Sequence, residues 1–216
     1  MNKNYEKIVS LVCNTLVEAG STFREDKKKA YKRAIASEDN EKAKWVLETV
    51  LANAEAAEKN HSPLCDDTGI PHIVLEIGPD AAVTGRMLDA IREGIAKGLR
   101  KLPGRPMGIM GDDCRRIDQS GGLNPDSAGV EPAPILIRRC QDNVIRLHIL
   151  MFGGGPAIRA KTYRVFHKHN MQVVLDEIVN WATEGVAQLG CSPCTLAVGV
   201  GRSHFEATSM MLQAQV

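Results

Sequence analysis

Apolar residues recur every three or four positions through the first 60 residues of the chain. This spacing is typical of amphipathic helices that bury one face. It predicts three helices, from Glu6 to near Gly20, over residues 23–37 and over residues 40–58. We therefore expect this part of the chain to fold as helical hairpins.

Shorter apolar runs replace the helical pattern after residue 61. Alternating or β-branched runs predict strands over residues 70–77, 135–139, 144–151 and 196–200. Longer amphipathic patterns predict helices over residues 80–99 and 171–189, and Ser203 is expected to cap a last helical segment. The stretch between residues 103 and 134 is rich in proline and glycine, and we expect it to be a long irregular loop.

These elements predict an α+β fold, in which N-terminal helical hairpins pack on a small mixed or antiparallel β-sheet with flanking helices. The 216 residues suit a single domain over 1–216, helical over 1–60 and carrying the sheet and site loops over 61–216. The last segment reaches Val216 without a glycine cap or a following proline. We therefore expect the C-terminal end to be incomplete.

Charge and composition exclude several classes of protein. The net charge is +1, so the basic face of a nucleic-acid-binding protein is not expected. No apolar stretch approaches the roughly 20 residues that span a bilayer, and the N-terminus lacks the apolar core of a signal peptide. We therefore expect a cytoplasmic protein without a membrane or nucleic-acid partner, whose six cysteines stay reduced.

The loop before the strand at residue 70 combines a thiol, two acids and a glycine. Cys65 is followed by Asp66 and Asp67, and Gly69 supplies a turn. Two adjacent acids disfavour a nucleophilic thiolate, whereas a bound metal would hold the thiolate form. Metal ligation and a role as a small buried hydrophobe are both open for Cys65.

Two later segments carry further candidate chemistry. Residues 153–155 are three glycines that follow a strand, so their backbone could approach an anion closely or form a flexible hairpin. Cys191 and Cys194 form a C-x-x-C pair, which suits zinc, iron–sulfur or redox chemistry, or two core thiols beside a proline turn.

Together, these segments resemble the N-terminal (alpha) part of the class I fumarase and tartrate dehydratase family of iron–sulfur hydro-lyases. Members of that family carry a C-Q-D-T-G-T loop after a helical region, a strand leading into K-G-G-G-S, and a cysteine–proline turn after a long helix. The corresponding segments here are C-D-D-T-G-I at 65–70, M-F-G-G-G-P at 151–156 and C-S-P at 191–193.

The resemblance implies a 4Fe-4S cluster that has Cys65 and Cys191 as two of its thiolate ligands. It implies that Asp67 is catalytic and lies beside the substrate. The substrate-binding residues that it implies are Asp66, Arg105, Gly154 and Gly155. By residue counting, Arg100 is the rival of Arg105.

The resemblance also implies the reaction and the partners. The reaction would be the reversible hydration of a small dicarboxylic acid, of the fumarate/malate or tartrate type. In that family the catalytic base comes from a beta domain or subunit. We therefore expect a beta partner, a homodimer of alpha chains and an inactive isolated chain.

The sequence departs from the family pattern in three ways. Asp66 replaces a glutamine, Pro156 replaces a serine, and the third cluster cysteine of the family would lie beyond Val216. The third ligand is therefore open among Cys114, Cys140 and Cys194, and the cluster could be absent from this chain. Two other functions stay open: a zinc- or thiol-containing binding protein, and an inactive structural fragment of a hydro-lyase.

Overall fold

The computed structural model describes residues 3–67, 69–102, 108–153, 160–189 and 191–216. The chain forms two compact units, Met1–Gly153 and Gly154–Val216, which are called the N-terminal and C-terminal units below. Each is described by itself. The interpretation of residues 1–216 as a single domain stays a prediction.

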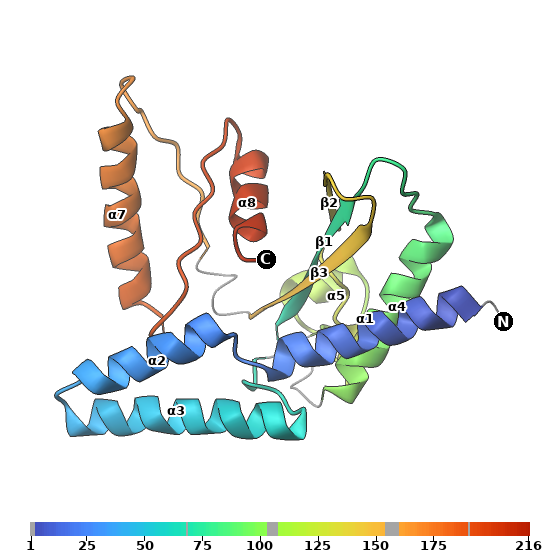
Figure 1. Cartoon of the computed structure of the whole chain (residues 1–216), viewed down its shortest axis with the longest axis horizontal. Helices are drawn as coiled ribbons and strands as arrows, with labels where there is room; N and C mark the ends of the chain where they lie inside the picture. The colour runs from blue at the N-terminus through green and yellow to red at the C-terminus, as the bar shows by residue number, and fades with distance from the viewer. Residues whose placement is uncertain (1–2, 68, 103–107, 154–159, 190) are drawn as a thin grey trace. The chain divides into compact units, whose positions relative to one another are not determined.

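The N-terminal unit combines helices with a small sheet (Figure 1). Its main helices are α1 (Lys3–Ser21), α2 (Glu25–Ser37), α3 (Glu41–Asn60) and α4 (Gly85–Lys101). Its strands are β1 (Ile70–Ile77), β2 (Leu136–Arg139) and β3 (Ile145–Phe152). Two short helical pieces, α5 (Asp113–Asp118) and η1 (Ser127–Gly129), lie between α4 and β2. The expected α+β class is confirmed.

The sheet has the strand order β2-β1-β3, with β1 in the centre. β1 runs parallel to β2 and antiparallel to β3, so the sheet is mixed. The β1–β3 ladder extends from the pair Ile70–Phe152 to the pair Ile77–Ile145. The start of β1 and the end of β3 therefore lie next to each other at one end of the sheet.

The core lies between one sheet face and the pair α1 and α4. Ile73 and Leu75 of β1 project into it because residues two apart share a strand face. They contact a cluster of apolar side chains from α1, α4 and the segments that follow α4: Val12, Leu16, Ile91, Ile95, Leu99, Leu102 and Val130.

Two glycines of α4 allow α1 to approach it closely. A Cβ on Gly94 would lie 2.6 Å from Val12 Cβ and 2.8 Å from Val9 O. A Cβ on Gly98 would lie 3.0 Å from Leu16 Cβ. The two helices can therefore pack this closely only because Gly94 and Gly98 have no side chain.

α2 and α3 form an antiparallel helical hairpin (Figure 1). Asn40 caps α3 by accepting hydrogen bonds from the backbone N–H groups of Lys42 and Ala43. Lys28 of α2 donates to the Glu58 carboxylate at 2.7 Å and so joins the two helices. Residues 1–60 are helical as expected, but they form one hairpin, α2 with α3, whereas α1 packs against α4.

The fourth helix starts later than the sequence predicts. We expected it to begin at Asp80, but Thr84 is the N-cap and accepts a hydrogen bond from Met87 N–H. The Asp80 and Ala81 N–H groups instead donate to Asn143 Oδ1 and Gly78 O. These bonds form a turn, which delays the helix.

The strand expected over residues 196–200 is absent from the described part of the chain, and that prediction is wrong. A β-strand needs a neighbouring strand to pair its backbone groups. Here Gly199 and Gly201 instead approach the backbone of the last helix at Ala207 and Glu206. The segment therefore lies along a helix.

The C-terminal unit contains α7 (Met171–Ala187) and α8 (His204–Gln213). Ser203 caps α8 as predicted, because its hydroxyl accepts from Glu206 N–H, and α8 ends before Val216. Tyr163 stacks on Trp181 of α7 with ring centroids 3.9 Å apart. No side chain is buried among the described residues of this unit. In the described part of the chain, no helix is long and apolar enough to cross a membrane.

We predict that Gly94→Ala lowers the free energy of unfolding by about 1–3 kcal/mol, because the new methyl group overlaps Val12 and the Val9 carbonyl. This loss outweighs the better helix propensity of alanine, which is about 1 kcal/mol at most. Urea denaturation followed by circular dichroism measures the change.

Gly85→Ala is the matched control, since a Cβ at Gly85 meets no atom within 4 Å. That variant should keep wild-type stability or gain up to about 1 kcal/mol. Equal stability of the two variants would contradict the close approach of α1 to α4.

Candidate functional site

The loop that carries Cys65 follows α3 directly and is fixed at its start. His61 ends α3 in the left-handed conformation, with φ 50°. The Ser62 N–H then donates to Ala57 O at 3.0 Å. Leu64 is held on both sides, because its N–H donates to Gly20 O at 3.0 Å and its carbonyl accepts from Asn53 Nδ2 at 3.1 Å.

The other end of the loop contacts the end of β3. Gly69 has φ +90°, in the left-handed region that glycine tolerates. A Cβ at Gly69 would lie 2.6 Å from the Phe152 carbonyl carbon and 2.8 Å from Gly153 N. Any side chain at residue 69 would therefore force the loop away from β3.

The Asp67 carboxylate lies beside the first residue of the triple-glycine segment. A Cβ on Gly153 would be 3.2 Å from Asp67 Oδ2, which is tight contact. Asp67 is half-buried, and its Oδ1 is shielded from solvent. The structure thus joins two segments that are far apart in the sequence and that we singled out separately.

Cys65 and Asp66 are exposed at the apex of this loop. Their neighbour Asp67 faces the glycine segment, so the three residues present a thiol and two carboxylates within a short, anchored stretch. Such a stretch can offer a thiolate to a metal and a carboxylate to a polar ligand.

The other predicted site residues are not brought to this loop by described contacts. Arg105, Gly154 and Gly155 lie outside the described residues. Cys191 is exposed and belongs to the C-terminal unit. The roles of these four residues stay predictions.

Arg100, the rival of Arg105, already has a partner. Its Nε and Nη2 donate to the two carboxylate oxygens of Asp126 at 3.0 and 2.7 Å. The Asp126 carboxylate raises the pKa of Arg100. This bidentate pair holds the segment around η1 against the end of α4, a structural role.

The described residues contain no group of three or more His, Cys, Asp and Glu side chains placed to hold a metal ion. Among the spare thiols, Cys140 follows β2, where its N–H donates to Ile77 O at 3.1 Å. That is the opposite end of β1 from Ile70, roughly 23 Å away at the rise of a strand. Cys140 therefore lies at the opposite end of β1 from the strand residue that follows the Cys65 loop.

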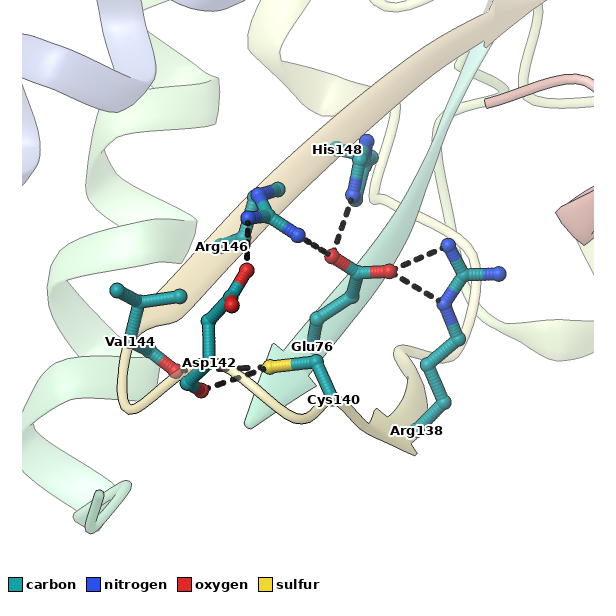
Figure 2. A network of polar contacts seen from close by, with 7 residues as sticks. All are labelled: Glu76, Arg138, Cys140, Asp142, Val144, Arg146 and His148. Carbon is teal, nitrogen blue, oxygen red and sulfur yellow. Dashed lines mark hydrogen bonds and ion pairs between the residues drawn. The ribbon is translucent and has the colours of Figure 1, made fainter. Parts of the chain in front are cut away.

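A network of ionic contacts centres on Glu76, which sequence analysis did not single out (Figure 2). Glu76 lies opposite Arg138 of β2 and Arg146 of β3 in the register of the sheet. Both guanidinium groups contact its carboxylate, and His148 Nε2 lies 3.4 Å from Oε2. The sequence feature that could have revealed this network is an acidic residue, Glu76, among the apolar residues of β1.

The two arginines explain why a carboxylate is tolerated at a position that is 7% exposed. Hydrogen bonds from Arg146 and then Arg138 lower the pKa of Glu76 from 4.5 to about 2. The network ties the three strands together on the face opposite the apolar core. Its role is to hold the sheet, away from the Cys65 loop.

Comparisons with known proteins give the family of the chain. A family model described as fumarate hydratase (fumerase) matches residues 9–216, so the chain belongs to this family. A Methanocaldococcus jannaschii protein named putative L(+)-tartrate dehydratase subunit alpha is 27% identical over 198 residues, which are 90% of this chain and 66% of that protein. A Geobacillus stearothermophilus protein named putative fumarate hydratase class I is 24% identical over 156 residues, which are 72% of this chain and 28% of that protein.

The chain thus spans just under two thirds of the length of the first relative and less than a third of the second. The family resemblance inferred from the C-D-D-T-G loop, the triple glycine and the cysteine–proline turn is confirmed.

We predict that Glu76→Gln makes stability less dependent on acid pH. A folded pKa of about 2, below the ordinary 4.5, means that Glu76 stabilises the fold above the ordinary value and loses this effect as pH falls from 4.5 to 2. The variant should be less stable than the wild type at neutral pH, and the difference should shrink in acid. Urea unfolding at several pH values measures both trends.

The exposed residue Glu55 supplies the control variant Glu55→Gln. A constant stability difference between wild type and Glu76→Gln across this pH range would show that the arginine contacts do not set the titration of Glu76.

Proposed function

We propose that this chain is the alpha component of an iron–sulfur hydro-lyase that reversibly hydrates or dehydrates a small dicarboxylic acid, of the fumarate/malate or tartrate type. The observation that carries the proposal is the contact between the Cys65–Gly69 loop and Gly153. It brings the thiol-and-acid motif and the start of the glycine motif into one place within a member of the fumarate hydratase family.

In this proposal Cys65 and Cys191 are two thiolate ligands of a 4Fe-4S cluster. Cys65 suits this role because it is exposed on a loop whose preceding residue is hydrogen-bonded on both sides. When bound, such a cluster would supply an open iron as a Lewis acid. For the third ligand, Cys114, Cys140 and Cys194 stay open, or a thiol outside this chain; the place of Cys140 at the other end of β1 disfavours it.

The remaining residues bind and orient the substrate. Asp67 is the catalytic residue, because its carboxylate is held beside the glycine segment where a substrate would lie. Gly154 and Gly155 would donate backbone N–H groups to one substrate carboxylate, and Arg105 would pair with another. Asp66 would accept a hydrogen bond from a substrate hydroxyl. Because Asp66 adds negative charge beside an anionic substrate, the positive charge of Arg105 would offset the repulsion.

The name of the Methanocaldococcus jannaschii relative includes the words subunit alpha. We therefore propose that a beta partner completes the site and supplies the base, and that alpha chains pair as a homodimer. A cytoplasmic location stays a prediction from the sequence.

The test is anaerobic reconstitution of the chain with iron and sulfide, followed by mixing with a candidate beta subunit and assay on fumarate and tartrate. Wild type should bind iron and sulfide and convert one of the two acids. Cys65→Ser should lose the bound iron and at least about 100-fold in activity, since it removes a ligand.

Cys140→Ser is the control, because Cys140 lies at the other end of β1 and a hydroxyl can keep its bond to Asp142 O. That variant should behave as wild type. Zinc without iron in anaerobically purified protein, or equal iron in Cys65→Ser and wild type, would contradict the proposal.

A further inference from the structure

The residue immediately before Cys65 has its backbone tied to two different helices. Leu64 N–H donates to Gly20 O at the end of α1, and Leu64 O accepts from the side chain of Asn53 on α3. The direction in which the Cys65 thiol points depends on this backbone, because the Leu64 carbonyl belongs to the peptide group that leads into Cys65.

Asn53 has no evident role in α3 itself. It lies on an exposed face in the middle of the helix, where asparagine is a poorer helix former than leucine or glutamine. Its Nδ2 donates at 3.1 Å to a carbonyl 11 residues further along the chain. The side chain therefore contributes through the loop.

We propose that Asn53 is a positioning residue for Cys65: by holding the Leu64 carbonyl, it fixes the direction in which the Cys65 thiolate meets a bound metal cluster. This inference rests on the proposed function as far as the cluster is concerned. It gives the N-terminal helices, which carry few catalytic residue types, a direct part in the site.

The test uses the full chain and the substitution Asn53→Leu. Leucine is close in size, adds no charge and favours the helix, so a loss of function cannot come from a weaker α3. In the metal-free protein, hydrogen exchange at the Leu64 amide, which donates to Gly20 O, should become about fivefold faster, because losing the bond to the Leu64 carbonyl lets this part of the loop open more often. After anaerobic reconstitution, a chelator should remove iron about tenfold faster than from wild type.

Two further variants separate positioning from other effects. Asn53→Gln keeps an amide donor and should restore much of the slow iron loss. Ala52→Leu adds the same apolar side chain at the neighbouring exposed position and should match wild type in both measurements. A merely structural bond would change amide exchange and leave the rate of iron loss unchanged.

Wild-type rates of iron loss in Asn53→Leu, or equal acceleration in Ala52→Leu, would overturn the inference. If wild type takes up no iron at all, the hydro-lyase proposal fails. Exchange at the Leu64 amide then decides separately whether Asn53 fixes the residue before Cys65, and an unchanged rate would overturn that as well.

Discussion

The contact of Gly69 with the backbone of Phe152 and Gly153 is the constraint on which the candidate site depends. It occurs where β1 begins and β3 ends, because the antiparallel register pairs Ile70 with Phe152. The residue before β1 and the residue after β3 must then lie close together, and the absence of a side chain at residue 69 leaves the space for it. The Asp67 carboxylate reaches Gly153 as a consequence.

The rest of the N-terminal unit holds β1 in place and so stabilises this end of the sheet. One face of β1 is held by α1 and α4, whose close packing depends on Gly94 and Gly98. The other face is held by the arginine pairs around Glu76. The α1 and α3 helices then fix Leu64, so the Cys65 loop is held at both of its ends.

Local patterns made much of this fold predictable. The bounds of β1 follow from a run rich in isoleucine, valine and leucine between Gly69 and Gly78, and Ser203 was recognisable as a cap. The start of α4 was misplaced because Asp80 resembles a cap, yet its N–H bonds to Asn143, a residue far along the chain. The segment 196–200 has the composition of a strand, but pairing is a non-local property that composition does not specify.

The candidate site likewise has features that local motifs predict and features that depend on contacts between distant segments. Cys65, Asp67 and the glycine segment could be found from their motifs, because the residue types themselves carry the chemistry. The contact of Asp67 and Gly69 with Gly153 could not, since it arises from the register of β1 against β3. Asn53 was not predictable either, because an exposed helical asparagine shows its role only when its hydrogen-bond partner is known.

The central claim is that the Cys65 loop and the glycine segment form one site, and nuclear magnetic resonance of the full chain tests it most directly. A nuclear Overhauser cross-peak between a Gly69 α-proton and the Gly153 amide proton is expected, because Gly153 N lies 2.8 Å from the position of a Cβ on Gly69. Its absence, in a protein that shows the cross-peaks of the Ile70–Phe152 pair, would contradict the account.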